Sequence, residues 1–190
     1  MIPKNILIPH YSINMSKTVK DLETYATIIE SSIYDIYKAQ KINNPLNKFC
    51  LYGVRKNTIK TNQETVLFNF IEEVKQNQYH IYPPLVELIQ SSSTYYLCFE
   101  SFNLMLDVIL SKGYKDNYLY NITKRKQYID DMRRIAAYSE RQLAPVSLIM
   151  DDHHVYCLPP YNSPKGNHHQ NNKNLMIKLM YSLITGDKLS

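Results

Sequence analysis

Hydrophobic side chains recur at intervals of three and four residues over much of the chain, the spacing that places them on one face of an α-helix. The clearest stripe begins after Ser16 and ends before Asn43-Asn44-Pro45. Its apolar members are Val19, Leu22, Tyr25, Ala26, Ile29, Ile33, Ile36 and Tyr37. We therefore expect a long first helix in this part of the chain.

Further segments carry the same spacing, and several have residues that favour a helix terminus. Thr61 and Glu64 have the spacing of a capping box, Pro83-Pro84 suits the first turn of a helix, and Gly113 suits the position after a helix end. The predicted helices are 46–57, 63–76, 85–90, 102–112, a basic helix at 120–143, and 174–185.

Only short segments have a β-like pattern. Residues 95–99 form one apolar run, and 146–150 and 155–158 flank the turn-like Asp151-Asp152-His153-His154, which predicts a hairpin near 146–158. The predicted fold is mainly α, a compact multi-helix domain over 16–158 with that one hairpin. An extended arm over 1–15 precedes it, and a polar linker with a C-terminal helix over 159–190 follows it.

Composition supports the helical interpretation. The 190 residues include only 4 glycines, and few glycines leave few positive-φ turns for the hairpins of an all-β fold. The 3 cysteines are far apart and in no CxxC arrangement, which favours a reducing compartment over a disulfide scaffold. No stretch has the length of a membrane span or a signal segment, so we expect a soluble protein without a membrane partner.

Positive charge points to an anionic partner. The formal net charge is +5, and such a surplus favours polyanions through counterion release. The predicted DNA-binding residues are Asn47, Lys48, Arg55, Lys56, Lys60, Lys124, Arg125, Lys126, Arg133 and Arg134. Asn47 and Arg55 would lie towards bases or groove edges, and the lysines of the first group, Lys48, Lys56 and Lys60, would contact phosphates. The alternative is a solvated helix face with ordinary ion pairs, such as Asp130 with Arg134.

No residue pattern resembles the active site of an enzyme. The scattered glycines cannot build a phosphate-binding or dinucleotide-binding loop, and no cysteine lies beside an evident activating base. The segment Asp151-Asp152-His153-His154 with Cys157 contains metal-ligand residue types, but adjacent residues in a turn supply two ligands at most, and zinc needs three or four. We therefore expect no catalytic residue, no metal and no cofactor.

The segment Asn47-Lys48-Phe49-Cys50-Leu51-Tyr52 resembles the opening of the alpha box, the DNA-binding region of fungal mating-type alpha1 proteins. Gln63 to Val74 resembles the next helix of that box, and Leu85 to Gln90 its third. The resemblance covers about residues 43–112. The chain departs from the family in having Gly53 where an arginine is common, and in lacking its tryptophans.

This resemblance implies an HMG-like helical fold that bends or widens its DNA site. It also implies a nuclear transcriptional activator of alpha-specific genes, which binds double-stranded DNA beside a MADS-box partner. In this hypothesis the helix at 46–57 reads DNA. Two other classes of protein fit the sequence: a helical protein-interaction adaptor, including a viral one, that binds no nucleic acid, and a small metal-dependent hydrolase that uses Asp151, Asp152, His153 and His154.

Overall fold

The computed structural model describes residues 16–30, 34–59, 64–105, 122–138, 148–158 and 178. These residues belong to two compact units. The sheet unit contains the described residues of 9–77 and 83–102, and the α3 unit contains those of 78–82 and 103–190.

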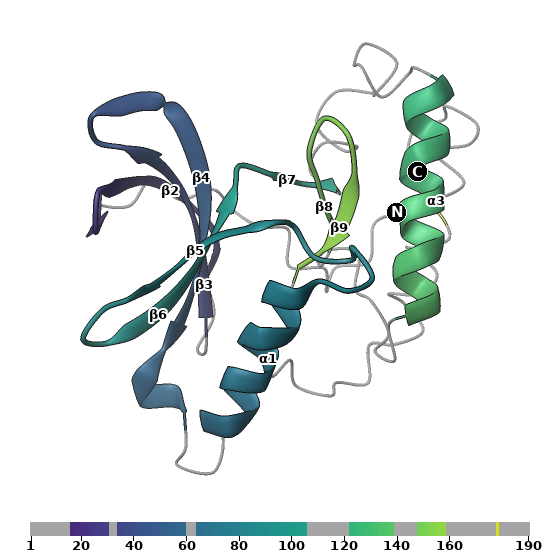
Figure 1. Ribbon diagram of the computed structural model, residues 1–190. Coiled ribbons are helices and arrows are strands. Elements are labelled where there is room, and N and C mark those ends of the chain that lie inside the picture. Colours follow the sequence, from purple (N-terminus) through teal and green to yellow (C-terminus); the bar gives the residue numbers. More distant parts are fainter. Residues whose placement is uncertain are drawn as a thin grey trace. The chain divides into compact units, whose positions relative to one another are not determined.

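A curled antiparallel sheet of six strands forms the sheet unit (Figure 1). Its strands lie in the order β1-β2-β3-β4-β6-β5, so β1 and β5 are its two edges. Their bounds are β1 Thr18–Val19, β2 Leu22–Glu30, β3 Tyr34–Lys41, β4 Asn44–Arg55, β5 Leu85–Gln90 and β6 Thr94–Glu100. The predicted mainly α, HMG-like fold is therefore wrong.

The long helix predicted after Ser16 is replaced by β1, β2 and β3. Two irregularities interrupt the pairing of β2 with β3, one between Thr24 and Ala26 and one between Thr27 and Ile29. An extra residue at a β-bulge shifts the alternation of side chains in the strand. Apolar residues of a bulged strand can then recur at intervals of three, which imitates the period of a helix.

The predicted helices at 46–57 and 85–90 are also wrong: residues 46–55 belong to β4, which a 3-10 helix over Lys56–Thr58 follows, and 85–90 is β5. β4 pairs with β3 on one side and with β6 on the other. Its central residues from Cys50 to Val54 are all buried, because both faces of this part of the sheet are covered. A continuous apolar run of this kind does not distinguish a buried strand from a buried helix.

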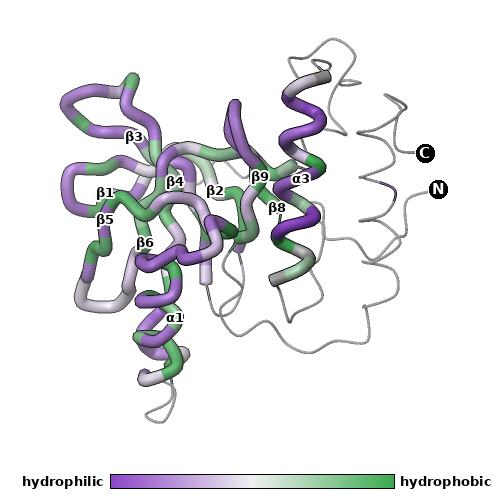
Figure 2. The backbone as a smooth tube through the Cα atoms, turned by 45° about the vertical axis from the view of Figure 1, so that its right-hand side comes forward, coloured by the Kyte–Doolittle hydropathy of each residue, from purple (hydrophilic) through white to green (hydrophobic). Residues whose placement is uncertain are grey.

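The helix predicted at 63–76 is confirmed as α1, Glu64–Gln76. Its buried stripe consists of Leu67, Phe70, Ile71 and Val74, and Figure 2 shows hydrophobic and hydrophilic residues alternating along the helix. The helix ends where Asn77 adopts a φ of 40° and donates its backbone N–H to the carbonyl of Glu73 at 2.9 Å. Asparagine tolerates this left-handed conformation at a helix end better than most residues.

The α3 unit contains one described long helix and a small sheet in the order β7-β8-β9. Its elements are β7 Asn103–Leu104, α3 Ile122–Tyr138, β8 Leu148–Met150 and β9 Val155–Cys157. The basic helix and the hairpin predicted from the sequence are thus present. Within the described residues, no helix is long and apolar enough to cross a membrane.

The remaining predicted segments lie partly or wholly outside the described residues. Of the predicted helix at 102–112, Asn103–Leu104 is strand β7, Met105 is helical, and 106–112 lies outside the described residues. The arm at 1–15 and the linker from 159 also lie outside them. So does the C-terminal helix, except for Lys178, which is helical.

Candidate functional site

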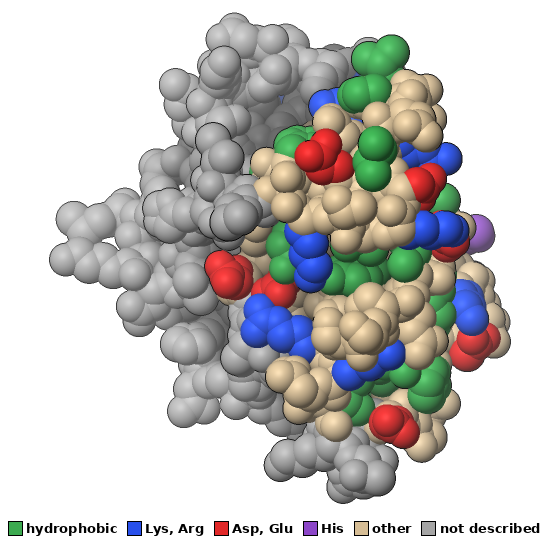
Figure 3. All heavy atoms as spheres, turned by 90° about the vertical axis from the view of Figure 1, so that its left-hand side faces the viewer, with side chains coloured by type: hydrophobic (Ala, Val, Ile, Leu, Met, Phe, Trp, Pro, Cys, Tyr) green, Lys and Arg blue, Asp and Glu red, His purple; other side chains and the backbone are tan. Residues whose placement is uncertain are grey.

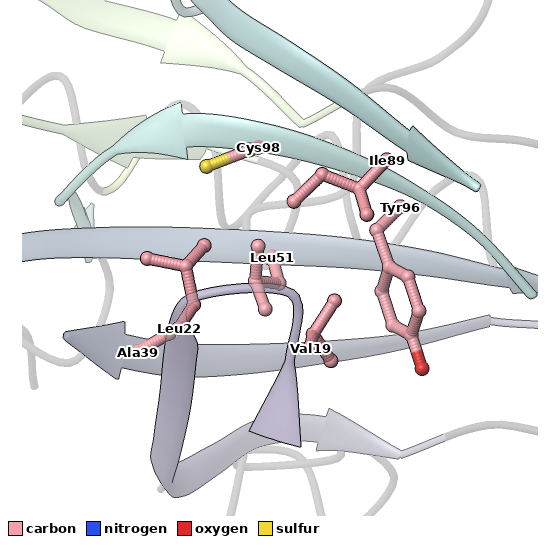
Figure 4. Packing of buried hydrophobic residues seen from close by; sticks show 7 residues of the cluster. All are labelled: Val19, Leu22, Ala39, Leu51, Ile89, Tyr96 and Cys98. Carbon is pink, nitrogen blue, oxygen red and sulfur yellow. The ribbon is translucent and has the colours of Figure 1, made fainter. Parts of the chain in front are cut away.

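The inner face of the curled sheet is closed by a cluster of apolar side chains to which all six strands contribute (Figure 4). Its buried members are Val19, Leu22, Ala39, Leu51, Ile89, Tyr96 and Cys98. Burial of this apolar surface favours the curl of the sheet. Burial also raises the pKa of the Cys98 thiol to about 12, so this cysteine is a packing residue and a poor nucleophile.

A hollow of about 470 Å³ lies on the same face, next to this cluster. Its lining consists of Lys17, Asp35, Tyr37, Gly53, Arg55, Lys56, Asn57, Ser92, Ser93, Thr94 and Tyr96, which together we call the basic pocket. Three of these side chains are cationic and one is anionic, so the lining carries a net charge of +2. The remaining polar members provide hydroxyl and amide donors.

Asp35 fixes the position of Arg55 at the pocket. The Arg55 Nη2 atom lies 2.8 and 2.7 Å from the two carboxylate oxygens of Asp35, and Nε lies 3.2 Å from one of them. This hydrogen bonding raises the pKa of Arg55 above its ordinary value. The Tyr37 hydroxyl donates to the same carboxylate at 3.0 Å, and burial, with the charge of Asp35, raises the pKa of Tyr37.

Among the described residues, no carboxylate pairs with either lysine of the pocket. Lys17 Nζ lies 5.2 Å from the ring centroid of Tyr96 and 5.8 Å from that of Tyr37. Lys56 Nζ donates to the backbone carbonyl of Ser91 at 2.6 Å and lies 4.7 Å from the ring centroid of Tyr95. Aromatic faces hold these ammonium groups without neutralising them.

The turn between β5 and β6 completes the rim with hydroxyl groups. Ser91 organises this turn, since its side-chain oxygen accepts the backbone N–H of Thr94 at 3.0 Å and that of Ser93 at 3.3 Å. The turn is also joined to the end of β4, because the Lys56 N–H donates to the Ser93 carbonyl at 2.8 Å. The hydroxyl groups are therefore placed beside the lysines.

Gly53 keeps the floor of the pocket open. A Cβ atom at this position would lie 2.8 Å from Cε1 of Tyr96 and 3.0 Å from its Cδ1. Tyr96 is only 1% exposed, so its ring has little room to move. A side chain at position 53 must therefore displace the packed ring.

We expect the substitution Gly53→Ala to lower the free energy of unfolding by about 1–3 kcal/mol, the usual cost of overpacking a core. Urea denaturation followed by far-UV circular dichroism measures this change. Ser92→Ala is the matched control, because Ser92 lines the same pocket but is exposed, and its effect should stay within about 0.5 kcal/mol. Equal stability of the two variants would show that Tyr96 moves freely.

Of the predicted DNA-binding residues that the structure describes, Arg55 and Lys56 lie at the basic pocket. Asn47 and Lys48 are exposed near the other end of β4. Lys48 and Arg55 are seven positions apart in one strand, so their side chains point to opposite faces of the sheet. Lys60 lies outside the described residues. The other five, Lys124, Arg125, Lys126, Arg133 and Arg134, are on α3, in the other unit.

Two of the α3 cations are paired with acids of the same helix. Arg133 Nη1 lies 3.6 Å from Asp130, and Arg134 Nη2 lies 2.9 Å from Asp131. The pair suggested by the sequence, Asp130 with Arg134, is thus replaced by two pairs at a spacing of three. These contacts reduce the positive charge that α3 can offer to a phosphate backbone.

The acidic and histidine segment at 151–154 forms the turn between β8 and β9. The Asp151 carboxylate accepts the backbone N–H groups of His153 and His154, both at 2.7 Å, which is an Asx-type turn. His154 Nδ1 lies 3.1 Å from the buried carboxylate of Asp131. Among the described residues, no group of three or more His, Cys, Asp or Glu side chains could hold a metal ion.

Charge on the face of the molecule drawn in Figure 3 is mixed. Figure 3 shows Lys and Arg side chains distributed among acidic, hydrophobic and other polar ones, without one continuous basic area on this face. The described part of this face therefore favours a local binding site over a broad contact with a polyanion. Neither a family model nor a curated protein matches the sequence.

Proposed function

We propose that this protein is a non-catalytic binding protein whose sheet unit holds an anionic group of a partner in the basic pocket. The observation that carries this proposal is the pair Lys17 and Lys56, both at the pocket and both without a carboxylate partner among the described residues. A phosphate or carboxylate there would gain charge-assisted hydrogen bonds. It would also relieve the repulsion between cations that face one hollow.

The order of elements in the sheet unit invites a comparison with protein kinases, at the level of fold alone. In kinases, a lysine on the third strand of the small sheet pairs with the ATP phosphates and with a glutamate on the following helix, and a glycine-rich loop covers the phosphates. In this chain β4 is the third long strand and α1 follows it. Tyr52 of β4 contacts Phe70 of α1, with ring centroids 6.4 Å apart.

This aromatic pair supports binding over phosphoryl transfer. Two packed rings provide neither a cation for phosphates nor a carboxylate to orient one. The sequence between β2 and β3, Ser31-Ser32-Ile33, contains no glycine. We therefore assign the binding activity to the basic pocket on the other face of β4.

Double-stranded DNA remains a second candidate ligand because the net charge is +5. The alpha-box hypothesis required a DNA-reading helix at 46–57, and this segment lies mostly in strand β4. The nuclear location and the MADS-box partner stay predictions that rest on the resemblance alone. The helical adaptor hypothesis predicted protein binding in a groove between helices. Protein binding stays a prediction, but the sheet unit is built on a six-stranded sheet and not on a bundle of helices.

Titration of the ¹⁵N-labelled protein with inorganic phosphate, followed by amide NMR shifts, tests the proposal. We expect shifts in Asn57 and in residues 92–94, and at least a tenfold weaker affinity for the variant Lys17→Gln with Lys56→Gln. The matched control is Lys48→Gln with Lys75→Gln, which removes two exposed lysines elsewhere on the sheet unit. Equal affinity of both double variants would contradict the proposal.

Anisotropy with a labelled DNA duplex distinguishes the second candidate. A DNA-binding protein would lose affinity in both double variants, since each phosphate contact contributes to the salt dependence. A pocket-based function predicts little affinity for the duplex at physiological salt. Tight, salt-dependent binding that both double variants weaken equally would favour DNA.

A further inference from the structure

A second hollow lies between the two edges of the curled sheet. It measures about 560 Å³, and its lining comes from residues 17–20 on one side, from 87–93 on the other, and from Tyr96. Lys20, in the turn between β1 and β2, forms an ion pair with Glu87 of β5, so the two edges approach each other without pairing. We call this hollow the edge groove.

The edge groove and the basic pocket are continuous. They share Lys17, Ser92, Ser93 and Tyr96. A ligand that lies in the groove can therefore place a side chain in the pocket. Lys17 stands where the two hollows meet and can act on either part of such a ligand.

β5 has the properties of a strand that accepts another strand. It is at the end of the strand order and pairs with β6 alone. The backbone groups of an edge strand that face outward are free to pair with an added strand. β5 spans Leu85–Gln90, and its pairing with β6 is regular from Glu87 onward, so residues 87–90, which line the groove, offer a backbone edge to a ligand.

We propose that an extended segment of a partner protein adds to β5 along the edge groove and inserts one phosphorylated side chain into the basic pocket. This inference rests on the proposed function. Strand addition gives affinity through main-chain hydrogen bonds, and pockets for side chains give specificity. A phosphorylated side chain carries a charge of about −1.5 to −2 at pH 7, which matches the net +2 of the pocket lining. A single carboxylate would leave half of that charge uncompensated.

The test uses a short fluorescein-labelled peptide of alternating Val and Thr with one central phosphoserine, measured by anisotropy with the full chain. We expect it to bind at least tenfold more tightly than the same peptide with serine or glutamate. N-methylation of alternate backbone nitrogens should weaken binding at least tenfold, because a methylated nitrogen cannot donate to β5. The variant Lys56→Gln should weaken the phosphopeptide and leave the serine peptide unchanged, because Lys56 lines the basic pocket and not the edge groove.

Different outcomes separate this inference from the proposed function. If free phosphoserine binds as tightly as the phosphopeptide, strand addition is wrong and the anion pocket stands. If N-methylation leaves the affinity of the phosphopeptide unchanged, strand addition is likewise wrong and the anion pocket stands. If neither phosphate nor phosphopeptide binds, both proposals fail. A dimer seen by sedimentation velocity that excess phosphopeptide does not dissociate would assign the groove to a second copy of the chain and overturn the inference.

Discussion

Replacement of Asp131 by alanine is expected to lower the free energy of unfolding of the α3 unit by about 3–5 kcal/mol, the cost of removing one partner from a buried charge network. The Asp131 side chain is 0% exposed. It accepts hydrogen bonds from Gln127 Nε2 at 2.9 Å, Arg134 Nη2 at 2.9 Å and the Val155 N–H at 3.0 Å. His154 Nδ1 also lies 3.1 Å away. Alanine would leave several of these donors without an acceptor.

The measurement is hydrogen exchange of the Val155 amide together with urea denaturation. Asp130→Ala is the control, since it removes the same charge one residue earlier. The Asp130 side chain is 52% exposed and its contact with Arg133 is 3.6 Å, so we expect a loss of less than about 1 kcal/mol. If both substitutions cost the same, Asp131 does not connect α3 to the β8–β9 hairpin, and the hairpin is held by its apolar residues.

The helices that the sequence predicted correctly have one exposed and one buried side. α1 has a clear stripe of four buried residues on a polar helix, and α3 has buried Tyr128, Met132 and Ile135 at spacings of four and three. In both, the period of 3.6 is visible because polar residues separate the apolar ones. The central strands lack this contrast, since both of their faces are covered.

The low glycine content was misleading, because these hairpins need almost no glycine. Of the described non-glycine residues in strand turns of the sheet unit, only Lys20 has a positive φ, at 59°. The turn from β3 to β4 uses Ile42 and Asn43 between the paired Lys41 and Asn44. The turn from β5 to β6 uses side-chain hydrogen bonds of Ser91. Turn chemistry, rather than glycine count, was the relevant property.

The basic pocket could not be assembled from spacing along the sequence. Its members extend from Lys17 to Tyr96 and meet through the register of three neighbouring strands. Asp35 pairs with Gly53, and Gly53 pairs with Tyr96. Of the residues that line this pocket, the sequence analysis named Arg55 and Lys56 as candidate anion contacts and did not name Lys17 or Gly53. A register is set by pairing between distant segments, and no local pattern encodes it.

Tyr52 is the second position where a large effect is expected: Tyr52→Ala should lower the free energy of unfolding of the sheet unit by about 3–5 kcal/mol, as for other buried aromatic residues. Its side chain is fully buried. It stacks on Tyr34 with ring centroids 4.8 Å apart and an interplanar angle of 15°, and it contacts Phe70 of α1. Alanine would remove both ring contacts and leave a cavity between α1 and the sheet.

Urea denaturation measures this loss against Tyr25→Ala, in which a tyrosine that is 36% exposed is removed from the same unit. We expect the control to lose less than half as much, because less apolar surface is withdrawn from contact. A second substitution, Tyr52→Phe, tests whether this residue contributes to phosphate binding as well as to stability. It keeps the ring, and it lies on the face of β4 opposite Gly53 and Arg55, so phosphate affinity should remain unchanged. A tenfold change in phosphate affinity in Tyr52→Phe would place the anion site on the α1 side of the sheet instead of the basic pocket.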